Sequence, residues 1–174
     1  AEPRLAAPLA PCILGGMTSA TVTRDLADEA ATQAFAAALA PLTGPGDIIA
    51  LFGDLGTGKT AFARAFVRAL CGADEEVPSP TFTLVQLYDG PAATIWHFDL
   101  YRLERPEDAL ELDIEEAFAE GISLIEWPDR LAGWLPAERL DITLSRGASA
   151  TARRLSLTGH GGWAARLLEL SKHV

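Results

Sequence analysis

The sequence predicts an α/β fold, a three-layer sandwich built on a mixed, largely parallel β-sheet. First, apolar strand-like runs alternate with helical segments along the chain, an order typical of parallel sheets covered by helices. Second, one apolar run passes through a glycine-rich loop directly into a helical segment. Third, the turn Asp89-Gly90 lies between two strand-like segments. Strands joined by so short a turn pair antiparallel, which makes the sheet mixed.

The expected strands are runs rich in apolar, β-branched or aromatic residues between turn residues. They lie at residues 20–24, 47–52, 81–88, 93–98, 122–125, 140–144 and 154–157. The first is short, and we expect it at an edge of the sheet. The segments 81–88 and 93–98 flank the turn and form the expected hairpin.

The expected helices are segments with apolar residues at helical spacing or with strong helix formers. They lie at residues 28–40, after Thr60, at 106–120, at 128–134 and at 163–170. The first is rich in alanine and stops at Pro41 and Gly44. In the helix after Thr60, the residues Phe62, Phe66 and Leu70 recur every fourth position, so this helix buries one face.

The length of 174 residues, with 49% hydrophobic and 22% charged residues, fits one globular domain with a full core. We assign residues 18–174 to this domain. Residues 1–17 are apolar but interrupted by prolines, which suits neither a signal peptide nor a membrane helix. We therefore expect residues 1–17 to form a disordered extension.

The formal net charge of −10 limits the possible partners. Electrostatically driven nucleic-acid binding needs a basic surface that releases counterions from phosphates, so we expect the chain alone to bind RNA and DNA poorly. The acidic surface is compatible with a basic protein partner and equally with solubility alone. Cys12 and Cys71 have no metal-ligand spacing and form no disulfide framework, so we expect a cytoplasmic protein without membrane attachment.

The run Gly-Asp-Leu-Gly-Thr-Gly-Lys-Thr at residues 53–60 fits the Walker A pattern G-x-x-x-x-G-K-[ST]. Such a loop directs backbone amides at phosphate oxygens, while its lysine reaches the β and γ phosphates and its threonine ligates Mg²⁺. The expected nucleotide-binding residues are Asp54, Leu55, Gly56, Thr57, Gly58, Lys59, Thr60 and, further along the chain, Thr81. The sandwich is therefore expected to resemble P-loop NTPases. Because the chain contains no asparagine, it lacks the Asn-Lys-x-Asp motif that reads guanine, and ATP is the favoured nucleotide.

A phosphate loop of this kind works with an acidic residue at the end of a neighbouring strand. Asp99 and Glu126 each end an apolar run, where ligands of open α/β sheets bind. We expect Lys59, Asp99 and Glu126 to serve catalysis, and Thr60, Glu126 and Asp99 to serve Mg²⁺. Which of the two acids contacts the metal directly stays open, as does the alternative that either one only caps a helix.

Other side chains near these motifs have two interpretations each. Thr81 or Ser79 can sense the γ-phosphate, or the segment is an ordinary strand entry after a proline. Arg102 can act as an internal arginine finger, although a salt bridge is the commoner fate. A metal role for His97 is not favoured, because no second histidine lies nearby in the sequence. Trp127 is more often a core residue than a contact surface.

Four runs in this order closely resemble the bacterial TsaE (YjeE) family, over roughly residues 18–157. They are Gly-Asp-Leu-Gly-Thr-Gly-Lys-Thr (53–60), Ser-Pro-Thr-Phe-Thr-Leu (79–84), His-Phe-Asp-Leu-Tyr-Arg-Leu (97–103) and Leu-Ile-Glu-Trp-Pro-Asp (124–129). The resemblance implies a small cytoplasmic ATPase, weak alone, that supports the TsaD and TsaB proteins in threonylcarbamoyl modification of the tRNA adenosine beside the anticodon. Contact with tRNA would be indirect, through that complex.

The resemblance also implies roles for single residues. Lys59 and Thr60 resemble the phosphate and Mg²⁺ ligands of the family, and Glu126 resembles its second Mg²⁺ position. Asp99 resembles a carboxylate needed for hydrolysis, and Trp127 a residue linked to activity or partner contact. The sequence departs from the family at Asp113, where members often have glycine, and in residues 1–17, which have no counterpart.

Two other functions fit a Walker A loop. A small-molecule kinase of the P-loop class would use the same triphosphate site but usually needs a mobile lid carrying arginines, and the chain has no arginine-rich segment of this kind. A nucleotide-sensing module would bind Mg²⁺ and the nucleotide without turnover.

Overall fold

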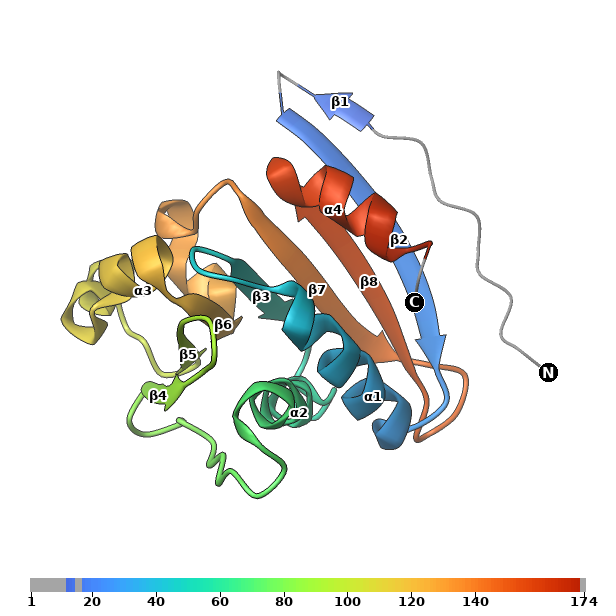
Figure 1. Cartoon of the computed structure of the whole chain (residues 1–174), viewed down its shortest axis with the longest axis horizontal. Coiled ribbons are helices and arrows are strands. Elements are labelled where there is room, and N and C mark those ends of the chain that lie inside the picture. The colour runs from blue at the N-terminus through green and yellow to red at the C-terminus, as the bar shows by residue number, and fades with distance from the viewer. Residues whose placement is uncertain (1–11, 15–16, 173–174) are drawn as a thin grey trace.

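The fold is that of a computed structural model, which describes residues 12–14 and 17–172. Eight strands within these residues form one sheet in the spatial order β1-β2-β8-β7-β3-β6-β5-β4 (Figure 1). The strands are β1 (Cys12–Leu14), β2 (Met17–Leu26), β3 (Ile48–Phe52), β4 (Val85–Asp89), β5 (Thr94–Asp99), β6 (Ile122–Glu126), β7 (Arg139–Arg146) and β8 (Arg153–His160).

The predicted mixed α/β sheet is confirmed. Its four central strands, β7, β3, β6 and β5, are parallel to one another. Antiparallel pairs flank them, with the predicted hairpin β4–β5 on one side and β7–β8–β2–β1 on the other. The prediction of a short edge strand at residues 20–24 is wrong, because β2 has ten residues and β1 lies outside it.

Helices pack on both faces of the sheet (Figure 1). The first layer contains α1 (Glu29–Leu39), the 3₁₀ turn η1 (Ala40–Leu42), α2 (Lys59–Cys71) and α4 (Gly162–Leu170). The second contains α3 (Ile114–Glu120) and the 3₁₀ segments η2 (Pro106–Leu112) and η3 (Pro128–Trp134). In β3, Ile49 packs in the core cluster of the first layer and Ile48 in that of the second, because successive side chains of a strand point to opposite faces.

The second layer covers only part of the sheet. Its core cluster draws on β3, β5 and β6, whereas the corresponding face of β2, β8 and β7 is polar. There the hydroxyls of Thr21 and Thr158 lie 3.1 Å apart, and Asp141 accepts hydrogen bonds from Arg139 and pairs with His160. The sandwich therefore has three layers around β3, β6 and β5 and two layers over β7, β8 and β2.

Two predicted boundaries differ from the structure. The expected helix at 106–120 is divided into η2 and α3 at Asp113, whose φ of 56° lies in the left-handed region, where glycine has the lowest cost. The expected strand at 81–88 begins only at Val85, because residues 80–84 form a turn closed by a hydrogen bond from the Leu84 amide to the Pro80 carbonyl.

The prediction that residues 1–17 are disordered falls mostly outside the described residues. Within this range the structure describes Cys12–Leu14, which form β1, and Met17, which begins β2. None of the helices that the structure describes combines the length and the apolar character that crossing a membrane requires.

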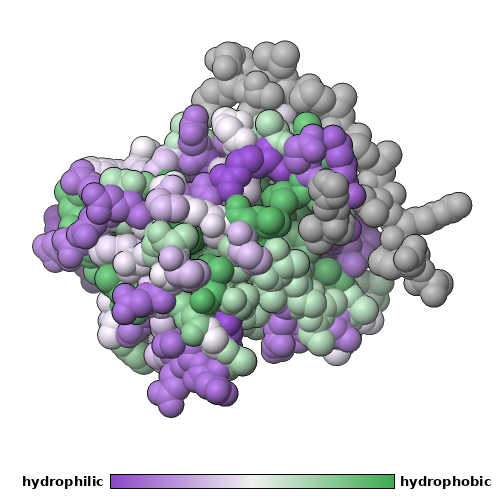
Figure 2. All heavy atoms as spheres, in the orientation of Figure 1, coloured by the Kyte–Doolittle hydropathy of each residue, from purple (hydrophilic) through white to green (hydrophobic). Residues whose placement is uncertain are grey.

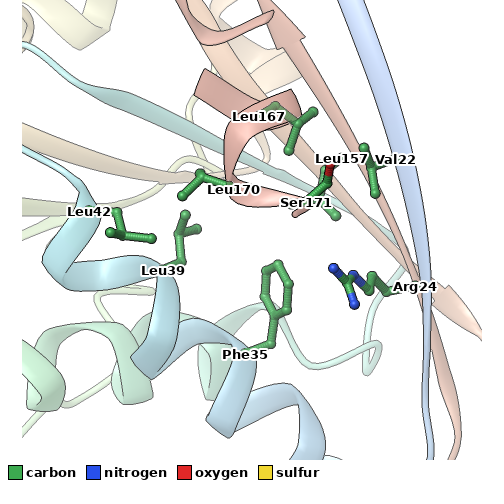
Figure 3. Close-up of a pocket in the computed structure, with 9 residues that line it drawn as sticks. All are labelled: Val22, Arg24, Phe35, Leu39, Leu42, Leu157, Leu167, Leu170 and Ser171. Atoms are coloured by element: carbon green, nitrogen blue, oxygen red, sulfur yellow. The ribbon is translucent and has the colours of Figure 1, made fainter. Parts of the chain in front are cut away.

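Apolar side chains of the helix layer surround a small cavity over β2 and β8. This cavity of about 20 Å³ lies between α1, α4 and these strands, and the side chains around it point toward one another (Figure 3). This volume accommodates about one water molecule, so the cavity is a packing gap. Over α1 the surface is weakly hydrophobic (Figure 2), because its exposed positions are mostly alanine.

We expect Gly159→Ala to lower the free energy of unfolding by about 2 kcal/mol through overpacking. A Cβ atom on Gly159 would lie 2.4 Å from the Trp163 carbonyl oxygen in the first turn of α4, so helix and strand would have to separate. Gly162→Ala is the matched control, since a Cβ there meets no atom within 4 Å. Chemical denaturation measures both, and equal stabilities would contradict the proposed close contact.

Candidate functional site

The Walker A run forms a compact loop between β3 and α2. Gly53 has a φ of 141°, and a Cβ atom there would lie 2.4 Å from the Leu144 carbonyl oxygen and 2.6 Å from Thr57 Oγ1, so only glycine fits. Thr57 closes the turn by donating from its amide and its hydroxyl to the Asp54 carbonyl. The α2 helix begins at Lys59, and its free N-terminal amides favour an anion at this point.

Arg153, the first residue of β8, forms hydrogen bonds with the Walker A loop from outside the cleft. Its Nε donates to the Thr57 carbonyl at 3.0 Å and its Nη2 to the Gly56 carbonyl at 3.4 Å. Its Nη1 donates to the carbonyls of Ala150 and Ala152. Sequence analysis missed this contact, because the two segments lie almost 100 positions apart and no motif joins them.

The Lys59 side chain is buried, with only 5% of its surface exposed. Its Nζ donates to the carbonyls of Gly53 at 2.6 Å and Asp54 at 2.9 Å. Burial lowers the pKa of Lys59 from its ordinary value, and the negative charges of Glu126 and Asp99 offset part of this effect. The ammonium is therefore held within the loop among groups that favour its charge.

Trp127 covers this ammonium, with its ring centroid 4.2 Å from Lys59 Nζ. The distance fits a cation–π contact. Trp127 also packs on Tyr101, with 4.9 Å between the ring centroids. Its backbone is left-handed, with φ 59° and ψ 51°, an unusual conformation for a bulky residue. Trp127 thus lines the cleft and also packs against the core cluster of the second layer, so each of its two interpretations describes part of its surroundings.

The two predicted carboxylates lie side by side. Asp99 and Glu126 are paired in register at the carboxyl ends of β5 and β6, and both are buried. Glu126 Oε1 accepts a hydrogen bond from Thr60 Oγ1 at 2.8 Å. Asp99 accepts from Thr81 Oγ1 at 3.3 Å and from the Tyr101 amide at 3.1 Å. The structure thus brings the predicted acids to the predicted loop.

Two further contacts complete this arrangement. His97 is fully buried and its Nε2 lies 2.7 Å from Glu126 Oε2. Ser79 Oγ lies 2.7 Å from Thr81 Oγ1, so both candidate γ-phosphate sensors lie beside Asp99. The Arg102 guanidinium lies over the Phe82 ring at 4.7 Å. Arg102 therefore lies at the site. Its observed contact is with an aromatic ring, whereas a salt bridge was the commoner expectation.

These side chains surround a cleft of about 400 Å³, a volume typical of small-molecule sites. It is lined by Leu55, Gly56, Gly58, Lys59, Thr60, Ala61, Ser79, Thr81, Asp99, Tyr101, Arg102, Glu126 and Trp127. Two predicted nucleotide-binding residues lie outside this lining. Asp54 contributes its carbonyl to Lys59, and Thr57 faces a second, smaller cavity of about 70 Å³ with Glu29, Thr32, Thr151 and Arg153.

The donors and acceptors at the cleft suit a polyphosphate with a divalent ion. The N-terminus of α2 and the Lys59 ammonium are positive, whereas Thr60, Asp99 and Glu126 supply the hydroxyl and carboxylate oxygens that Mg²⁺ prefers. The carboxylates stand opposite the positive loop, so an anion bound at the loop needs a cation between it and them.

We expect Arg153→Ala to loosen the phosphate loop. The loss of charge-assisted hydrogen bonds should lower the free energy of unfolding by about 1.5–3 kcal/mol and should speed hydrogen exchange at the amides of residues 56–58. The matched control is Arg154→Ala, because Arg154 is exposed and pairs with the exposed Asp25, and such pairs contribute little. Unchanged exchange at residues 56–58 in Arg153→Ala would contradict the role of this side chain.

Comparisons with known proteins identify the family. The family model of the Threonylcarbamoyl adenosine biosynthesis protein TsaE matches residues 26–155. The tRNA threonylcarbamoyladenosine biosynthesis protein TsaE of Rickettsia bellii is 43% identical over 119 residues, which cover 68% of this chain and 83% of that protein. The protein of the same name from Bacillus subtilis is 38% identical over 143 residues, which cover 82% and 89%.

The solved structures agree with this result. The crystal structure of Bacillus subtilis YdiB is similar, with a TM-score of 0.73 and 30% sequence identity, and the match covers 87% of this chain and 94% of that chain. The family match contains the phosphate loop, both carboxylates and Arg153, so it includes the whole cleft. The resemblance inferred from the four sequence runs is confirmed, and the chain belongs to the TsaE family, which is involved in threonylcarbamoyladenosine biosynthesis for tRNA.

Proposed function

We propose that the chain binds Mg-ATP in this cleft and hydrolyses it to support a TsaD–TsaB complex in the threonylcarbamoyl modification of tRNA. The proposal rests on one observation. Lys59 and Thr60 of the Walker A loop line the same cleft as Asp99 and Glu126. Membership of the TsaE family supports the pathway, and the chemistry of the cleft supports the nucleotide.

The phosphates would lie against the amides of the loop and the first turn of α2. Lys59 Nζ donates to two backbone carbonyls, and phosphate oxygens would replace them as stronger, charged acceptors. Thr60 and Glu126 would hold Mg²⁺, since their oxygens are already joined by a hydrogen bond. Mg²⁺ supplies positive charge that stabilises the phosphate oxygens as the terminal phosphate leaves.

Asp99 is the carboxylate best suited to orient the attacking water. The Tyr101 amide and the Thr81 hydroxyl hold its two oxygens, so it is fixed at the cleft without a bond to the loop. A fixed carboxylate at this point can align the water and accept its proton. Thr81 would sense the γ-phosphate, because its hydroxyl already contacts Asp99.

The adenosine end of the nucleotide would lie toward the smaller cavity beside the loop. Glu29 and Thr32 of α1 line it together with Thr151 and Arg153. Thus the start of the first helix and the segment before β8 would form its walls. The two cavities share Gly56, Gly58 and Ala61, so one extended ligand can occupy both.

The rim of the cleft suits a protein partner. Leu55 is 64% exposed and Phe82 is 83% exposed, and Leu55 lines the cleft itself. Tyr101 lines the cleft as well and is 39% exposed, and a partner that buried these three side chains would remove apolar surface from water. A TsaD–TsaB complex covering this rim would exclude water from the cleft and complete the site, so hydrolysis by the chain alone would be slow. With a net charge of −10, the chain would leave tRNA contact to that complex.

The fate of the γ-phosphate of labelled ATP tests the proposal. In the presence of TsaD and TsaB we expect its release as inorganic phosphate. Transfer of the label to a small metabolite would instead support the P-loop kinase. If the label stays on the nucleotide even with both partners present, the nucleotide-sensing module is the one remaining function of the three.

We expect Lys59→Ala to lower this phosphate release by about 100-fold or more, because it removes a positive charge from the phosphate site. The chain has one other lysine, Lys172, whose ammonium pairs with Glu169 on the surface. Lys172→Ala should release phosphate at the wild-type rate. Equal rates in the two variants would exclude the assigned site.

We expect Phe82→Ser to weaken binding to the TsaD–TsaB complex at least about tenfold, as loss of a large apolar contact does, with little change in thermal stability. Leu42→Ser is the control, because Leu42 is also exposed but lines the cavity between α1 and α4. Calorimetric titration with the TsaD–TsaB complex measures the affinity of each variant. The same affinity for both variants would exclude the rim as the docking surface.

A further inference from the structure

We propose that His97 is a positioning residue, which orients the Glu126 carboxylate so that it can serve Mg²⁺ together with Thr60. This inference rests on the proposed function, because it assigns His97 to the metal side of the same cleft. His97 is absent from the cleft lining, so it does not contact the nucleotide directly, and its hydrogen bond to Glu126 is the link between His97 and the site.

The position of His97 follows from the sheet. Its side chain shares a face of β5 with Ile95, which packs in the core cluster under α2. The residue is fully buried. A polar ring in an apolar layer is costly unless it is hydrogen-bonded. Its only partner among the described residues is Glu126, through Nε2 at 2.7 Å, and Nδ1 is buried without one.

The direction of this hydrogen bond follows from its partner. A carboxylate oxygen only accepts, so the ring donates through Nε2–H. Nδ1, which is buried without a partner, is then an acceptor, and no N–H group of the ring is left unpaired. The ring is therefore a fixed, single donor aimed at Glu126 Oε2.

Glu126 is thus held at both of its oxygens. His97 holds Oε2, and the Thr60 hydroxyl donates to Oε1. Only 2% of the surface of Glu126 is exposed, so these two hydrogen bonds are strong constraints on the orientation of its carboxylate. With Oε2 fixed by the ring, Oε1 faces the residue that would ligate the metal. Hydrogen-bond donors to such carboxylates fix their orientation and strongly influence metal affinity.

Three substitutions separate the hydrogen bond from the size of the ring. His97→Leu removes the donor. In His97→Gln the side-chain amide reaches the position of Nε2 and can still donate to Glu126, whereas in His97→Asn it ends near Nδ1 and cannot. If His97→Leu does not fold, the Gln and Asn variants still decide the question, because both retain a polar side chain.

The chain also contains a matched control. His160 Nε2 lies 2.8 Å from Asp141 Oδ2, so it forms the same type of pair, but on the polar face of β7 and β8. His160→Leu should therefore leave the behaviour of the cleft unchanged.

The experiment measures binding of a fluorescent ATP analogue, once with EDTA and once during a Mg²⁺ titration. We expect His97→Leu and His97→Asn to raise, by about tenfold, the Mg²⁺ concentration that gives half of the maximal change in nucleotide binding. Binding in EDTA should stay within about twofold of wild type, and His97→Gln should lie near wild type. A purely structural role would weaken binding equally in both conditions.

A wild-type Mg²⁺ requirement in His97→Leu and His97→Asn would overturn the role of His97 and leave the proposed function standing. So would a Gln variant that needs as much Mg²⁺ as the Asn variant. If the wild-type chain binds no nucleotide in either condition, the proposed function fails, and the role of His97 fails with it.

Discussion

The parallel pairing of β3 with β6 and of β6 with β5 is the constraint on which the site depends. Parallel strands end at the same edge of a sheet, so the loop after β3 and the carboxylates that end β6 and β5 meet there. Leu51 is in register with Glu126, and Glu126 with Asp99. The backbone hydrogen bonds of the sheet therefore bring the positive loop and the two acids together, independently of any side-chain contact.

The buried charges at this edge stabilise one another. Lys59 is held by two carbonyls and the Trp127 ring, and Glu126 is held by Thr60 and His97. Isolated buried charges are costly, and a donor or acceptor for each atom offsets that cost. This arrangement gives each of the two buried charges partners within the chain. Several of these side chains, Thr60 and Lys59 above all, would change partner when a triphosphate binds.

Local sequence patterns predicted most of the fold and the centre of the site. Strand and helix periodicity located β3, β6, α1 and α2, and the Walker A spacing identified Lys59 and Thr60, because both signals lie within a short window. Contacts between distant segments were not predictable in this way. Arg153 and His97 form hydrogen bonds with partners far along the chain, and no local pattern encodes such partners. The break in the helix at Asp113 was missed because it depends on one left-handed residue, which helical periodicity does not reveal.

The central claim is that the Walker A loop and the two acids form one site for a triphosphate with Mg²⁺. A crystal structure with a non-hydrolysable ATP analogue and Mg²⁺ tests it most directly. The account predicts phosphate oxygens on the amides of residues 56–60, Lys59 Nζ on phosphate, and Mg²⁺ at Thr60 beside Glu126. A nucleotide bound elsewhere, with Lys59 still on the carbonyls of Gly53 and Asp54, would contradict it.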